Sequence, residues 1–140
     1  YFSKKVFDSN SAGYMYDGEC GEDGLTKLFT EMNVDVKCQV KKDIKIDDEI
    51  TLVAKPDFLF PSFILEAKCP KNSDLSEVPE KWIYQLETYY RAFNLPVKLG
   101  VIMHHPFRVK VITYKPSDEV WETIQRSLLG FHKQLKQLNK

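Results

Sequence analysis

Residues 56–68 read PDFLFPSFILEAK and decide how this chain folds. Within them, the apolar run from Phe63 to Ala67, broken only by Glu66, is typical of a strand that is covered on both faces. Side chains two residues apart in a strand project to the same face, so Glu66 and Lys68 are expected to lie together. Asp57 can meet them across a hairpin. A buried glutamate and lysine need polar partners or a metal ion, so we expect chemistry at this point.

The segment before this stretch predicts one helix and two strands. Apolar residues recur at helical spacing over residues 21–33, with Asn33 as a plausible end. Valine and cysteine alternate with polar residues over 34–40, which predicts a half-buried strand that Ile44 and Ile46 can extend. Asp47-Asp48 then offers a turn into a returning strand over 50–54.

The segment after it predicts a second helix over 78–93, two strands over 97–103 and 107–114, and a last helix that follows Pro116 to the C-terminus. The element order is therefore αβββαββα, without repeats or linkers. Helices interleaved with strands imply the α/β class, here an α/β/α sandwich around a central mixed sheet. At 140 residues the chain is long enough for one core and too short for two ordinary domains, so we expect a single domain over 1–140.

The composition of the chain indicates which class of protein it belongs to. Hydrophobic residues make up 43% and charged residues 29%, which is close to globular averages. No apolar run approaches the roughly 20 residues that span a bilayer, so no membrane association is expected. The three cysteines show no zinc-like spacing, and we expect reduced thiols in the cytoplasm, with Cys38 as a small buried hydrophobe. Acidic residues gather in the first half and basic residues in the second, although the net charge is zero.

A carboxylate cluster is the feature that carries chemistry. Phosphodiester hydrolysis at neutral pH uses divalent cations to neutralise the phosphate and activate a water. Mg²⁺ takes few protein ligands and keeps several waters, so carboxylates on adjacent strands suffice. Asp57 and Glu66 supply them, the backbone carbonyl of Ala67 can also reach a metal, and Lys68 adds a cation nearby.

Pro56-Asp57 followed by Glu66-Ala67-Lys68 resembles the motif of the PD-(D/E)xK nuclease superfamily. The resemblance implies the restriction-endonuclease-like fold and a Mg²⁺- or Mn²⁺-dependent deoxyribonuclease. It also implies that Lys68 orients or deprotonates the attacking water. Family members often add an acidic residue from the preceding helix, for which Glu22 is the best match and Glu19 the alternative.

Gln85 and Tyr89 fit the QxxxY pattern of the RecB-like/Cas4-like branch. The resemblance places both side chains beside the site, where they help hold the lysine and the substrate phosphate. The iron–sulfur members of that branch use four cysteines, whereas this chain has three, so no cluster is expected.

The expected partner is DNA, and the QxxxY pair favours single-strand or end processing over restriction, homing or junction resolution. Tyr14 and Tyr16 could stack on unpaired bases, or could simply anchor their loop. The sequence leaves open whether the protein forms a homodimer. The alternative function is a catalytically silent protein of the same fold that binds nucleic acid or serves as a scaffold.

Overall fold

The computed structural model describes residues 19–70, 77–103 and 108–139, with side chains from Gly24 onwards. Its helices and strands follow one another in the order α2 (Glu19–Glu31), β1 (Lys37–Cys38), β2 (Lys42–Lys45), β3 (Thr51–Ala54), β4 (Phe58–Leu59), β5 (Ile64–Lys68), α3 (Glu80–Phe93), β6 (Val97–Met103), β7 (Arg108–Thr113) and α4 (Asp118–Leu138).

The central sheet has five strands in the order β1-β4-β5-β6-β7. β5 and β6 pair in parallel, and the other neighbours pair antiparallel. The parallel pair is possible because α3 carries the chain back across the sheet between β5 and β6. The predicted α/β class and mixed sheet are confirmed.

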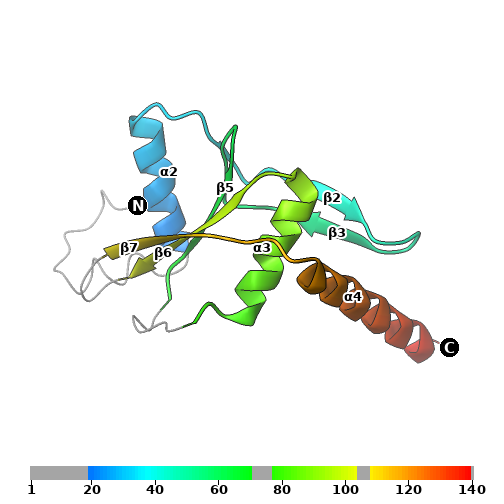
Figure 1. Ribbon diagram of the computed structural model, residues 1–140. Helices are drawn as coiled ribbons and strands as arrows, with labels where there is room; N and C mark the ends of the chain where they lie inside the picture. Colours follow the sequence, from blue (N-terminus) through cyan, green and yellow to red (C-terminus); the bar gives the residue numbers. More distant parts are fainter. Residues whose placement is uncertain (1–18, 71–76, 104–107, 140) are drawn as a thin grey trace.

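Helices cover both faces of this sheet (Figure 1). On one face, the ring of Phe29 in α2 meets the rings of Phe58 and Phe60 edge-on, with centroids 5.2 and 5.4 Å apart. On the other face, Leu86 and Tyr89 of α3 join the buried core. The sandwich follows from alternation along β4 and β5, since successive side chains supply opposite faces.

The predicted strand over 34–40 is wrong in extent. Only Lys37 and Cys38 pair with β4, and the chain then turns at Gln39, which has a φ of 57°. Residues in this left-handed conformation do not continue a strand. Cys38 is exposed rather than buried, so its expected role as a core hydrophobe is also wrong.

The hairpin over β2 and β3 forms as predicted, but it makes a separate two-stranded sheet. Asp47 closes its turn, because its Oδ1 accepts hydrogen bonds from the backbone N–H groups of Glu49 and Ile50, both at 2.8 Å. The short strand β4, absent from the sequence-based prediction, pairs with β5 in the central sheet.

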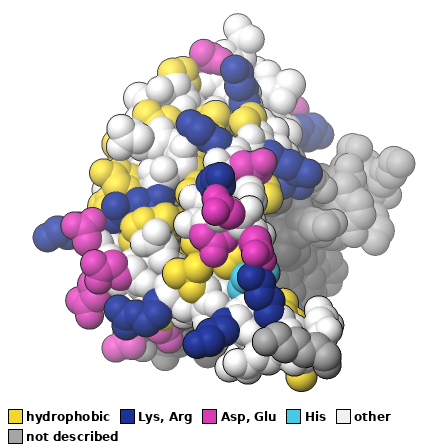
Figure 2. Space-filling view, turned by 90° about the vertical axis from the view of Figure 1, so that its right-hand side faces the viewer, with side chains coloured by type: hydrophobic (Ala, Val, Ile, Leu, Met, Phe, Trp, Pro, Cys, Tyr) yellow, Lys and Arg dark blue, Asp and Glu magenta, His cyan; other side chains and the backbone are white. Residues whose placement is uncertain are grey.

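Helix α4 runs away from the sheet beside the β2–β3 hairpin (Figure 1). The carboxylate of Glu49, near the hairpin turn, contacts His132 Nε2 at 2.7 Å and Lys136 Nζ at 2.8 Å. Figure 2 shows this face, where a histidine lies among interspersed acidic and basic side chains. Within the described ranges, no helix combines the length and apolar character that crossing a membrane demands.

Candidate active site

The β4–β5 hairpin brings Asp57 and Glu66 together. Phe58 lies opposite Leu65 in this pair, so the residues flanking them, Asp57 and Glu66, meet where β4 begins. The backbone N–H of Asp57 donates to Glu66 Oε1 at 3.1 Å, and the N–H of Ala67 donates to Asp57 Oδ2 at 2.9 Å. Each strand therefore fixes the carboxylate of the other.

Lys68 and Tyr89 complete this cluster around Glu66. Lys68 Nζ lies 3.3 Å from Glu66 Oε2, and the Tyr89 hydroxyl donates to the same oxygen at 3.1 Å. The same hydroxyl also lies 3.4 Å from the carbonyl oxygen of Lys55. Glu66 is 2% exposed, so its charge depends on these groups rather than on bulk water.

The surroundings change the acidity of two groups. Burial, with the negative charge of Asp57 as a second cause, raises the pKa of Glu66 to about 7, although Lys68 and the Asp57 N–H act in the opposite direction. Burial and the nearby charge of Glu66 also raise the pKa of the Tyr89 hydroxyl, which therefore stays protonated and donates. A cation beside the two carboxylates would relieve the destabilisation of the Glu66 charge.

Gln85 lies one helical turn before Tyr89 on α3. Its side chain is hydrogen-bonded to Tyr89 and opposes the rise in the pKa of that hydroxyl. Residues four apart share one side of a helix, so Gln85 lies on the side of α3 from which Tyr89 reaches Glu66.

The structure does not describe the side chains of the other predicted site residues. Glu22, like Glu19, belongs to α2, but its side chain lies outside the described part of the chain. Tyr14 and Tyr16 also lie outside the described residues. Among the side chains that are described, no group of three or more His, Cys, Asp or Glu residues could hold a metal ion. The described donors are thus the carboxylates of Asp57 and Glu66 and the Ala67 carbonyl.

One neighbour of the site was not predicted as functional. The Trp82 ring centroid lies 5.9 Å from Lys68 Nζ, within cation–π range. The sequence-based interpretation assigned Trp82 to the apolar face of the helix. A signal was present, because Trp82, Gln85 and Tyr89 are spaced by three and four residues and share one face of α3.

No protein-family model matches the sequence, and no curated protein matches it either. Known structures are similar in fold. The chain shares its fold with an exonuclease. The alkaline exonuclease LHK-Exo from Laribacter hongkongensis superposes with a TM-score of 0.61 at 14% identity, over 94% of this chain and 71% of that one.

Two further structures are similar. The protein SSO0001 gives a TM-score of 0.61 at 19% identity over 78% of this chain, and a Eubacterium rectale protein provisionally named as an exonuclease gives 0.55 at 14% over 82%. This chain spans 54% and 51% of their respective lengths. At these identities the likeness extends to the fold, and the roles of individual residues rest on the geometry above.

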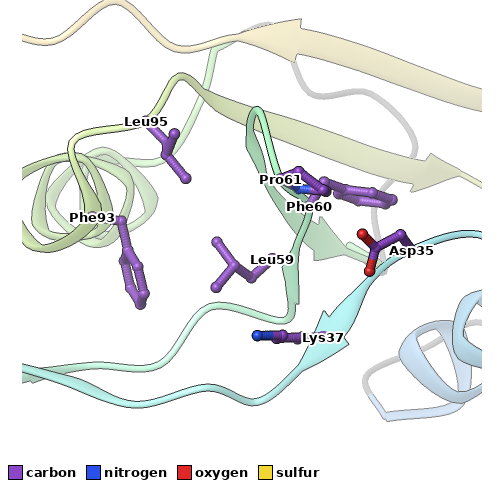
Figure 3. A pocket seen from close by; sticks show the side chains of 7 residues that line it. All are labelled: Asp35, Lys37, Leu59, Phe60, Pro61, Phe93 and Leu95. Carbon is purple, nitrogen blue, oxygen red and sulfur yellow. The ribbon is translucent and has the colours of Figure 1, made fainter.

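A cavity of about 290 Å³ lies away from this cluster. Figure 3 shows its lining side chains, which come from β1 and the segment before it, from β4 and the turn after it, and from the end of α3 and the segment that follows. They are Asp35, Lys37, Leu59, Phe60, Pro61, Phe93 and Leu95. None of these lining residues is Asp57, Glu66, Lys68 or Tyr89, so this cavity is not part of the candidate site.

Proposed function

We propose that this chain is a metal-dependent deoxyribonuclease of the PD-(D/E)xK type, with the RecB-like branch as the nearest relation. The observation that carries the proposal is the meeting of Asp57 and Glu66 across the hairpin, with Lys68 Nζ 3.3 Å from Glu66. The backbone N–H of Asp57 donates to Glu66, and the N–H of Ala67 donates to Asp57. The fold shared with an alkaline exonuclease supports it.

The donor set fits a hard divalent cation such as Mg²⁺ or Mn²⁺. Carboxylate and carbonyl oxygens are the ligands these ions prefer, and few are needed because the ions keep waters. Asp57, Glu66 and the Ala67 carbonyl would hold the ion, with Glu22 as a further carboxylate. When bound, the ion supplies positive charge for the phosphate and lowers the pKa of a water. An iron–sulfur cluster is not part of the proposal.

The protein's own groups then have separate tasks. Lys68 orients the attacking water by donating to it from its ammonium group, or takes the proton of that water as the neutral amine. Tyr89 fixes the Glu66 carboxylate through the hydrogen bond at 3.1 Å, and Gln85 fixes Tyr89. Gln85 and Tyr89 also stand on the side of α3 from which a substrate phosphate can be contacted.

The proposed substrate is DNA with unpaired ends or unpaired strands, processed in the cytoplasm. The QxxxY pair and the exonuclease fold support end processing over site-specific cutting. The chain spans only part of the length of these neighbours, so their further activities and partners are not transferred.

The test compares the wild-type chain with Asp57→Asn, Glu66→Gln and Lys68→Ala on labelled single-stranded, duplex, flapped and junction DNA. Each reaction is run with Mg²⁺, with Mn²⁺ and with EDTA, alongside calorimetric titration of the metal. Both carboxylate variants should lose metal binding and cleavage. Lys68→Ala should keep metal binding and lose turnover, because its group acts on the transition state. Wild-type protein that binds no divalent metal, or variants that cleave as fast as wild type, would refute the proposal.

A second function, nucleic-acid binding without turnover, has one observation in its favour. The described side chains include no metal-binding group of three acidic, His or Cys residues. This alternative predicts wild-type protein that binds DNA with the same affinity in Mn²⁺ and EDTA and leaves it intact. The proposed nuclease predicts cleavage in Mn²⁺ and no cleavage in EDTA.

A further inference from the structure

Two adjoining cavities form one groove between the first half of α3 and β7. One, of about 60 Å³, is lined by residues that include Trp82, Met103 and Lys110. The other, of about 190 Å³, is lined by residues that include Leu86, Tyr114 and Lys115. Both are lined by Val78 and Ile112, so they adjoin, and we call them together the Trp82 groove.

The groove exists because β7 is the last strand of the sheet. Helix α3 packs over β5 and β6, where Tyr89 reaches Glu66 and Leu86 joins Leu99 in the core. Beyond β6, only part of the α3-facing side of β7 is covered. The α3-facing side of β7 presents Lys110 and Ile112, since Ile112 pairs with Leu99 and Lys110 pairs with Val101.

One end of the groove reaches the candidate active site. Trp82 lines the groove, and its ring lies 5.9 Å from Lys68 Nζ. Val101, another lining residue, is the direct partner of Lys68 in the β5–β6 pair. A chain molecule lying in the groove would therefore pass from the site along the sheet edge.

The lining suits a polymer with apolar faces and negative charges. The floor is aliphatic, Trp82 and Tyr114 supply aromatic rings at the two ends, and Lys110 and Lys115 supply exposed ammonium groups. Glu77 is the acidic residue in the lining, and it lies at the Trp82 end. The Tyr114 ring is held in place, because its hydroxyl donates to the buried Glu87 at 2.7 Å.

Neither cavity is large enough to enclose a drug-sized ligand. Each cavity is smaller than the roughly 300 Å³ at which pockets for small molecules begin. From Lys110 to Lys115, however, the extended strand covers about 17 Å. A long, shallow, partly basic channel matches an unpaired nucleic-acid strand, whose bases expose their faces, rather than a duplex, whose bases are stacked inside.

We propose that the Trp82 groove binds an unpaired DNA strand leading to or from the active site, with a base against Trp82 and phosphates near Lys110 and Lys115. This inference rests on the proposed function for its ligand, and it assigns the substrate strand to one defined surface. Trp82 is then a substrate-contacting residue as well as a neighbour of Lys68.

The test uses the fluorescence of Trp82. The chain has two tryptophans, so Trp121→Phe leaves Trp82 as the sole tryptophan emitter. This protein is titrated with a thymidine oligonucleotide and with a duplex of the same length, both in EDTA. The single strand should quench the emission, and the duplex should do so only at much higher concentration.

Affinity provides the second measurement. Trp82→Leu should weaken single-strand binding by about 5-fold to 150-fold, which is the effect of one stacked base, while Trp82→Phe should retain most of the affinity. Trp121→Leu is the matched control on α4 and should change nothing. Replacing Lys110 and Lys115 with Ala should reduce the salt dependence of binding, because fewer counterions are released.

The outcomes separate this inference from the proposed function. Cleavage in Mn²⁺ by wild type, with no quenching of Trp82 and full affinity in Trp82→Leu, overturns the groove and leaves the nuclease standing. Quenching and weakened binding without any cleavage in Mn²⁺ support the groove and overturn the nuclease. Circular dichroism of each variant shows whether it is folded, and the quenching experiment leaves Trp82 itself unchanged.

Discussion

The buried charge of Glu66 should make the metal-free protein less stable at alkaline than at acidic pH. In the unfolded chain this carboxyl ionises near its ordinary pKa of 4.5, whereas burial and Asp57 raise the folded pKa to about 7. The folded state therefore holds its proton more tightly, and stability falls as the pH rises through the interval between the two values. Below about pH 4.5 both states are protonated and this cost is absent.

The size of the effect follows from the shift. Each pKa unit corresponds to about 1.4 kcal/mol, so a rise from 4.5 to about 7 costs the folded state about 3 kcal/mol once the pH exceeds the folded pKa. Most of it, roughly 2–3 kcal/mol, develops between about pH 5 and about pH 8. Glu66 is 2% exposed, so solvent screening takes little from this figure.

Urea unfolding in EDTA at about pH 5 and about pH 8 measures this cost in wild type and in Glu66→Gln. The stability of the variant relative to wild type should rise by roughly 2–3 kcal/mol between the two pH values, because glutamine does not ionise. Glu66→Met should show the same trend, which separates the charge from the hydrogen-bonding pattern. A wild-type-to-variant difference that is the same at both pH values would refute the reasoning.

Further predictions concern the groups around the site. Mn²⁺ at about pH 8 should raise the melting temperature of wild type and leave that of Glu66→Gln nearly unchanged, as differential scanning fluorimetry would show. Tyr89→Phe should cost about 1–2 kcal/mol in urea unfolding at that pH, because a hydrogen bond to the buried carboxylate is lost. Glu87→Ala should cost about 3–5 kcal/mol, since it removes the buried carboxylate that pairs with Arg91 and accepts hydrogen bonds from Tyr114 and Ser117, yet cleavage below the melting temperature should persist. Glu49→Gln should speed amide hydrogen exchange at the β2–β3 turn, by removing the ion pairs to α4, without changing cleavage.

Part of the candidate site could be predicted from local pattern alone. Glu66 and Lys68 share a face because strands alternate, and Gln85 and Tyr89 share a face because helices turn every 3.6 residues. The helix end at Asn33 was also predicted from local sequence, and the structure gives this residue a φ of 56°. These features depend only on residues close together in the sequence, so a single sequence contains them.

The limits of local pattern appear in the first strands. Alternation over residues 34–40 predicted one continuous strand, but the left-handed turn at Gln39 ends β1 after Cys38. Alternation indicates which side chains are compatible with a half-buried face and does not say which neighbouring strand is available. β4 has two residues, too few for any periodicity to reveal it.

The sequence by itself determined the α/β class, and it pointed to Asp57, Glu66, Lys68, Gln85 and Tyr89 as candidate site residues. Only the tertiary structure decided that Tyr89 bonds Glu66 across 23 positions of sequence, that Trp82 stands beside Lys68, and that Glu87 is buried among Arg91, Tyr114 and Ser117. The physical reason is that periodicity records the burial of a face, whereas the partner on that face is chosen by packing between segments far apart in the chain. Burial raises the pKa of Glu66, so the acidity of this carboxyl group also depends on the tertiary structure.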